Sequence, residues 1–211
     1  MGPAVLGLPQ PALPILDLDA FRHHIDRGAT VIDTRPVTAW AAGHIDGALA
    51  IPLRDQFASW LGWLVDSDAP LVFVVGADQD RAELVRQCHQ IGYDQIIGEL
   101  AGSMTAWTSA GLSTRTTPLA DAADAGPGVL DVRQDREHAT GHVPGVTHLE
   151  LGRLPEVADQ LAGVDAVMCG HGERAATAAS ILERAGRPGV AVTVGGPGDW
   201  AAAAGQPLAT G

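Results

Sequence analysis

The amino-acid sequence predicts an α/β fold that is built twice, as two domains in tandem. Short apolar runs, typical of buried strands, alternate with segments whose apolar residues recur at helical spacing, and this alternation favours a largely parallel sheet. The same order of segments then recurs in the second half of the chain. Residues 141–145 (Gly-His-Val-Pro-Gly) follow their counterparts at 43–47 (Gly-His-Ile-Asp-Gly) by 98 positions, which indicates an internal duplication.

The elements of the first half can be assigned in chain order. Asp17 suits the cap of a helix whose apolar stripe contains Phe21 and Ile25, and Gly28 suits its end. The further elements expected are a strand at 31–35, a turn-rich loop at 43–48, a strand at 49–52, a helix around 57–64, a strand at 71–75, a helix at 81–91, a strand at 95–98 and a helix at 103–110.

The second half repeats these elements with one shortening. The strand at 129–133 matches the one at 31–35, but later motifs are offset by 93 positions instead of 98, so five residues are missing from the region that matches the helix around 57–64. A polar stretch that contains a proline separates the copies. We therefore expect a linker at 1–14, a first domain at 15–115 and a second domain at 116–211.

Composition limits the classes of function. The chain has 211 residues, of which 46% are hydrophobic, and its formal net charge is −12, which argues against nucleic acid and anionic membranes as partners. Its two cysteines are too few for a disulfide scaffold and suit a reducing, cytoplasmic location. No apolar run reaches the ~20 residues of a membrane helix, and the first residues lack the pattern of a signal peptide.

The loop that begins at Cys169 carries the strongest chemical signal. An apolar strand ends at this thiol, Gly170 and Gly172 allow the chain to curl, and Arg174 opens an alanine-rich helix. Backbone N–H groups in such a loop, together with the N-terminus of the helix, favour a bound anion and hence a thiolate. Cys169 is therefore the candidate nucleophile, and Gly76 stands in its place in the first copy.

The neighbours of the thiol are assigned by their position in the loop. The candidate substrate-binding residues are Gly170, His171, Gly172 and Glu173, and Arg174 joins Cys169 as the second candidate catalytic residue. Arg174 either attracts an anionic substrate or ties down the loop, and the presence of Arg81 in the first copy gives weight to the second role. His171 and Glu173 are expected at the mouth of a pocket, and we favour a solvated side chain for Glu173.

Taken together, these motifs resemble those of the rhodanese, or sulfurtransferase, family. They are Asp131-Val132-Arg133, Glu137, 141–145, Cys169-x4-Arg174 and Gly195-Gly196 before Trp200 in the second copy, and Asp33-Thr34-Arg35, 43–47 and Gly102 with Trp107 in the first. The resemblance implies a five-stranded, mainly parallel sheet flanked by helices in each domain. It also implies a catalytic second domain and an inactive first domain, in which Gly76 replaces the cysteine.

The resemblance implies sulfur transfer. Cys169 would take the sulfane sulfur of thiosulfate or a thiol persulfide and pass it to a thiol or another thiophilic acceptor. The expected partners are small sulfur-containing anions and low-molecular-weight thiols, without a cofactor or a metal. The alternative is a non-catalytic tandem rhodanese that serves as a sulfur-binding or interaction module of a larger sulfide-oxidation enzyme. A phosphatase is disfavoured, because related phosphatases place five residues, not four, between cysteine and arginine.

A narrower resemblance concerns bacterial fusion proteins in which a persulfide dioxygenase domain of the metallo-β-lactamase fold precedes rhodanese domains. It rests on Gly2-Pro3-x-x-Leu6-Gly7, on residues 60–64 and on the loop at 169–174. It implies an upstream domain of that fold as a possible partner, with a homo-oligomer as the other possibility. The metal-binding motif of such a domain is absent from this chain, so no metal and no dioxygenase activity are expected here.

Structural roles compete with functional ones at several residues. Cys169 itself could be a buried, inert thiol, and Cys88 is expected to be one. Trp60 and Trp63 belong either to the core or to an interface with the second domain or an upstream one. The pairs shared by both copies are expected to be structural, as buried ion pairs or braces of a loop: Asp33 with Arg35, Asp131 with Arg133, and His44 with its counterpart His142.

Overall fold

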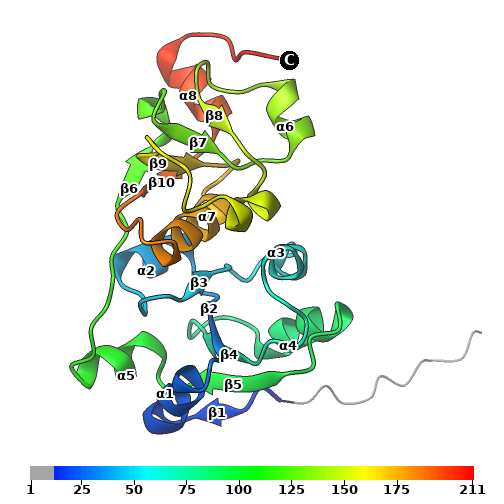
Figure 1. The fold of residues 1–211 in the computed structure, drawn as a ribbon, viewed down its shortest axis with the longest axis vertical. Helices are drawn as coiled ribbons and strands as arrows, with labels where there is room; N and C mark the ends of the chain where they lie inside the picture. Colours follow the sequence, from blue (N-terminus) through cyan, green and yellow to red (C-terminus); the bar gives the residue numbers. More distant parts are fainter. Residues whose placement is uncertain (1–11) are drawn as a thin grey trace, which may run out of the picture.

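The computed structural model describes residues 12–211, which form two α/β domains joined end to end (Figure 1). Elements of the first sheet and its helices run from residue 15 to 109, and those of the second from 119 to 204. The glycine- and proline-containing start, residues 2–7, on which part of the narrower resemblance rests, lies outside the described residues, as does most of the predicted linker at 1–14.

The first domain contains a five-stranded sheet in the order β1-β5-β4-β2-β3, in which every neighbouring pair is parallel. The strands are β1 (Ile15–Leu16), β2 (Thr30–Asp33), β3 (Leu49–Ala50), β4 (Leu71–Val74) and β5 (Ile96–Leu100). The helices are α1 (Leu18–Asp26), α2 (Val37–Ala42), α3 (Phe57–Leu64), α4 (Arg81–Gln90) and α5 (Ser103–Ser109). The side chain of Asp17 accepts a hydrogen bond from the backbone N–H of Ala20, so the predicted helix cap is confirmed.

The second domain repeats the arrangement as β6-β10-β9-β7-β8, again with parallel neighbours. Its strands are β6 (Leu119–Asp121), β7 (Val129–Asp131), β8 (Thr147–His148), β9 (Ala166–Met168) and β10 (Ala191–Val194). Its helices are α6 (Asp135–Thr140), α7 (Glu173–Arg184) and α8 (Pro197–Ala204), with short 3₁₀ turns η1 (Ala122–Asp124) and η2 (Leu151–Glu156). The predicted fold class, two tandem α/β domains with five parallel strands each, is confirmed.

The copies differ most where the second is shorter. The first copy has the regular helix α3 there, whereas the second has the 3₁₀ turn η2, which contains Pro155. These two elements pack against each other, and Gly152 of η2 lies so close that a Cβ atom there would be 3.7 Å from Cβ of Trp63. Trp63 is therefore an interface residue, while Trp60 is 7% exposed and belongs to the core.

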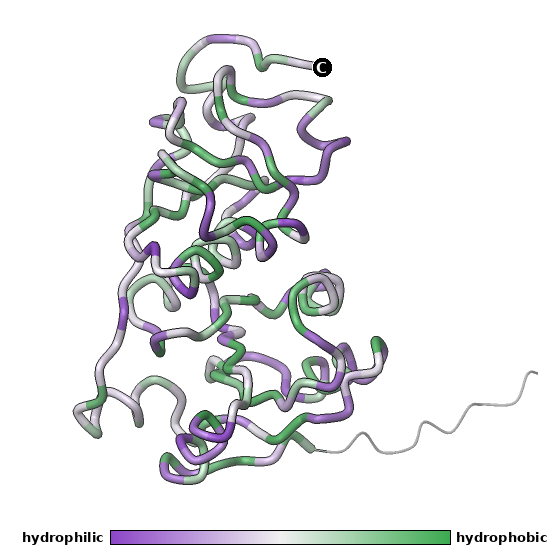
Figure 2. Tube along the Cα trace, viewed as in Figure 1, coloured by the Kyte–Doolittle hydropathy of each residue, from purple (hydrophilic) through white to green (hydrophobic). Residues whose placement is uncertain are grey.

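Helix α7 lies between the two sheets and joins them (Figure 1). All its residues from 175 to 182 are buried, and one apolar cluster contains side chains of both domains. The Ser180 hydroxyl accepts a hydrogen bond from the backbone N–H of Ala50 at 3.0 Å. Nε2 of His44 lies 3.2 Å from the carboxylate of Glu183, and both side chains are almost completely buried. The domains therefore share one core. Figure 2 shows the hydrophobic residues along the strands of both domains and the hydrophilic ones in loops and on outer helix faces.

The residue pairs shared by the copies are structural, as predicted. Arg133 donates to Asp131 and to the carbonyl of Gly141, and Arg35 makes the same contacts with Asp33 and Gly43. Each pair is buried and ties the loop after its strand to the following helix. No helix within residues 12–211 is both long enough and apolar enough to cross a membrane.

Candidate active site

The loop after β9 is folded tightly around the sulfur of Cys169. The backbone N–H of Gly172 donates a hydrogen bond to this Sγ at 3.1 Å. Gly172 has a φ of +112°, a conformation that side chains disfavour, and it is the residue from which α7 starts. Gly196 packs beneath the loop, where a Cβ atom would lie 2.5 Å from the carbonyl oxygen of Gly170. Glycine at positions 172 and 196 thus allows the backbone to lie close to the thiol and to the carbonyl groups of the loop.

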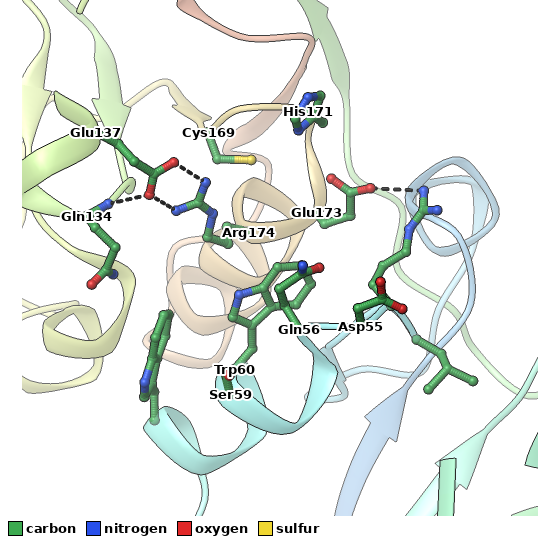
Figure 3. A pocket seen from close by; sticks show the side chains of 13 residues that line it. Asp55, Gln56, Ser59, Trp60, Gln134, Glu137, Cys169, His171, Glu173 and Arg174 are labelled. Carbon is green, nitrogen blue, oxygen red and sulfur yellow. Dashed lines mark hydrogen bonds and ion pairs between the residues drawn. The ribbon is translucent and has the colours of Figure 1, made fainter. Parts of the chain in front are cut away.

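Cys169 lies at the base of a pocket that both domains line. The pocket has a volume of about 920 Å³, and Cys169 is 1% exposed, so little of this residue is in contact with solvent. Figure 3 shows Glu137 and Arg174 on one side of the thiol, His171 and Glu173 on the other, and Trp60 of α3 across from them. The first domain therefore supplies a wall of the pocket without supplying a thiol.

Arg174 is fixed by Glu137. Its guanidinium donates to the two carboxylate oxygens at 2.6 and 2.8 Å, and the backbone N–H of Gln134 donates to the same carboxylate at 3.1 Å. The Glu137 carboxylate raises the pKa of Arg174, and Arg174 in turn lowers the pKa of Glu137. Arg174 stays charged near Cys169, but its hydrogen-bonding edge is directed at Glu137. This supports the bracing role for Arg174.

Glu173 forms an ion pair across the domain interface. Its carboxylate lies 3.0 Å from the guanidinium of Arg54, and its side chain is only 18% exposed. The prediction that Glu173 is a solvated side chain is therefore wrong, because the partner comes from a segment 119 residues away in the chain. The side chain of Arg54 is 62% exposed and lines the same pocket.

The remaining predicted site residues are His171 and Gly170. His171 is exposed at the mouth of the pocket, beside Glu173. Gly170 lines a different hollow, of about 510 Å³, together with His171 and Gly196. The structure thus gathers Cys169, His171, Glu173 and Arg174 around one pocket, with the N–H of Gly172 beneath the sulfur.

In the first domain, the corresponding loop at residues 76–81 is filled by the side chain of Gln79. Gln79, which corresponds to Gly172, accepts a hydrogen bond from the backbone N–H of Gly76 at 2.7 Å and another from the hydroxyl of Thr34 at 3.0 Å. Arg81 donates to Glu99 and to the carbonyl of Gly76, since Ala39 stands where the second copy has Glu137. This loop has no thiol, and the backbone N–H of Gly76 donates to the amide oxygen of Gln79.

Cys88 has the inert role predicted for it. It is completely buried on α4, and burial raises the pKa of its thiol to about 12. Within residues 12–211 no group of three or more His, Cys, Asp or Glu side chains is arranged so that it could hold a metal ion. Sequence reasoning missed Arg54, and no local signal marks it. The role of Glu137 could have been inferred from the sequence, because the first copy lacks both this carboxylate and the cysteine.

Comparisons with known proteins agree with the duplication. The rhodanese-like domain family matches this chain twice, at residues 17–110 and 116–203. A Bacillus subtilis protein named "Putative sulfur carrier protein YrkF" is 35% identical over 74 residues, which are 34% of this chain and 40% of that protein. This chain therefore matches well under half of that relative's length.

Two solved structures are similar at lower identity. A thiosulfate sulfurtransferase from Pseudomonas aeruginosa is 20% identical, with a TM-score of 0.40 over 93% of this chain and 43% of that one. The Alr3790 protein from Anabaena is 21% identical, with a TM-score of 0.42 over 48% of this chain and 82% of that one. At these values neither structure indicates what this chain does.

Proposed function

Because the chain belongs to the rhodanese family and contains two rhodanese-like domains in tandem, we propose that it is a sulfurtransferase with a single active site, at Cys169. The donor is thiosulfate or a thiol persulfide, and the acceptor is a thiol or another thiophilic molecule. The expected cytoplasmic location, the homo-oligomer and the upstream metal-binding domain stay predictions.

The reaction proceeds in two displacements. The Cys169 thiolate attacks the outer sulfur of the donor, the donor's S–S bond breaks, and the donor leaves as a thiolate or as sulfite. Cys169 then carries a persulfide, whose terminal sulfur has the negative charge. An acceptor thiolate attacks that sulfur, becomes a persulfide and returns Cys169 to its thiolate. Charge and electrons balance without an external oxidant.

The observation that carries the proposal is the hydrogen bond from the backbone N–H of Gly172 to Sγ of Cys169. A backbone donor aimed at sulfur, at the N-terminus of a twelve-residue helix, stabilises the anionic sulfur of both the thiolate and the persulfide. The terminal sulfur of the persulfide extends about 2 Å beyond Sγ, which places it in the pocket. The first domain retains the scaffold and lacks this arrangement.

Intact-mass measurement tests the proposal. After incubation with thiosulfate or glutathione persulfide, we expect the wild-type chain to gain the mass of one sulfur atom and to lose it on addition of a thiol acceptor. Cys169→Ala abolishes the gain. The matched control is Cys88→Ala, which leaves Cys169 as the only thiol and retains the gain. If no donor adds sulfur at Cys169, the chain is the non-catalytic module described above.

A further inference from the structure

The charged side chains around Cys169 restrict which donors the pocket accepts. Two arginines and three carboxylates line it, so the lining carries a net negative charge; they are Arg54, Arg174, Asp55, Glu137 and Glu173. Each arginine is paired with one of the carboxylates. An anion that binds either guanidinium in the pocket must therefore compete with the carboxylate already paired with it.

The two ion pairs differ in how easily an incoming anion can replace the carboxylate. Arg174 is 15% exposed and holds Glu137 through two short hydrogen bonds, one to each carboxylate oxygen. Arg54 is 62% exposed and holds Glu173 through a single contact of 3.0 Å. An exposed pair of this kind adds little stability, because water and salt compete with it. Arg54 is thus the guanidinium that an incoming anion can engage.

Arg54 also lies where two hollows meet. It lines the pocket above Cys169 and a second one, of about 500 Å³, that reaches the filled loop of the first domain at Gln79. The Arg54–Glu173 pair is part of the lining of both hollows. A molecule that extends from Cys169 into the second hollow therefore contacts this pair.

The distance between charge and sulfane sulfur then separates donor classes. In thiosulfate the charged oxygens sit two bonds from the sulfane sulfur, so they would compete with Glu137 for Arg174. In a persulfide of a carboxylated thiol, the carboxylate sits several bonds away from the reacting sulfur. It can engage a guanidinium at the pocket wall while the sulfur reaches Cys169. The side chain of Trp63, which is 42% exposed, provides apolar surface for the intervening atoms.

Building on the proposed sulfur transfer, we propose that Arg54, contributed by the inactive domain, is the residue that recognises the carboxylate of a thiol persulfide donor. Glu173 occupies the guanidinium until the donor arrives, and Arg54 exchanges one carboxylate for the other. The first domain thus determines donor specificity for a thiol that it does not carry. Asp55, exposed beside Arg54, opposes donors of excessive negative charge.

Steady-state kinetics with two donors of the same framework test this inference. The donors are the persulfides of glutathione and of glutathione diethyl ester, which differ only in their free carboxylates. We expect Arg54→Gln to raise the ratio of KM for the first donor to KM for the second about fivefold. Glu173→Gln frees the guanidinium and lowers the same ratio. The double variant lacks the guanidinium as well, so its ratio should stay above that of Glu173→Gln alone.

The control is Arg115→Gln. Arg115 is another exposed arginine of the first domain, 49% exposed and paired with Asp46 away from the pocket, so its loss changes the net charge equally. The ratio of KM values should not change in this variant. An unchanged ratio in Arg54→Gln, or an equal change in Arg115→Gln, overturns the inference while sulfur uptake at Cys169 still supports the transferase. If neither of these donors nor thiosulfate adds sulfur to Cys169, the transferase itself is refuted.

Discussion

Replacement of Glu137 by glutamine separates the two roles of Arg174. The substitution keeps the shape of the side chain and removes its charge. The Glu137 side chain is 41% exposed and makes two hydrogen bonds to a guanidinium that is 15% exposed. Breaking a fully buried pair costs about 3–5 kcal/mol. Exposure of the carboxylate reduces this, and we expect a loss of about 1–2 kcal/mol in the free energy of unfolding.

The stability change should depend on pH. Arg174 lowers the pKa of Glu137 below its ordinary value of 4.5. A carboxylate whose pKa is lowered by folding stabilises the protein above its unfolded pKa, and this contribution disappears as the pH falls through the folded value. Urea denaturation should therefore show the wild type more stable than Glu137→Gln at pH 7, with the difference shrinking below pH 4.5. In thermal melts at pH 7 we expect a decrease of about 2–8 °C for a unit of this size.

The same substitution should strengthen the binding of thiosulfate, although it destabilises the fold. Without Glu137, the guanidinium of Arg174 is free to bind an anion beside Cys169, so KM for thiosulfate should fall about threefold, equivalent to about 0.7 kcal/mol. The matched control is Glu99→Gln, which breaks the corresponding two-contact pair with Arg81 in the inactive domain. It should destabilise the chain without changing KM. If KM for thiosulfate stays constant or rises in Glu137→Gln, the reasoning about Arg174 is refuted.

Two further predictions concern the first domain. Gly76→Cys, made in the Cys169→Ala background, should take up no sulfur in the intact-mass assay, because the Gln79 amide oxygen lies 3.2 Å from the position of the new Cβ; a mass gain would show that this loop is not closed. His44→Phe should keep the stacking on Trp40 but leave the buried Glu183 unpaired, at a cost of about 1–3 kcal/mol in urea denaturation. An equal loss in His142→Phe, whose ring has no hydrogen bond to the first domain, would contradict a stabilising interdomain pair.

Sequence patterns predicted the parts of the molecule that depend on local order. The repeat located the loop of Cys169 and its inactive counterpart at Gly76, since both follow a buried strand and precede a helix. Buried Asp-x-Arg pairs were predicted as structural because they persist where the thiol is lost. The two-residue strand β1 was not predicted, because it is too short to show alternation and is defined only by its pairing with β5.

The polar contacts at the domain interface were not predicted, although an interface with the second domain was one of the two roles expected for Trp63. Glu173 was predicted to be solvated, and its partner Arg54 lies 119 residues away in the sequence. The five extra residues of the first copy were noted, but not that they build α3 as the wall opposite Cys169. A periodicity identifies which face of a helix is apolar and does not identify what covers it.

In the first copy, the substitutions around the missing cysteine fit together structurally. Loss of the cysteine at position 76 accompanies loss of the carboxylate at position 39, so Arg81 pairs with Glu99 and Gln79 closes the loop. The same domain retains α3 and Arg54, which face the other copy's thiol. Helix α7 buries its apolar residues against both sheets, so a separated second domain would expose them. The pocket above Cys169 is therefore formed by both domains together, and the first copy supplies part of the candidate active site.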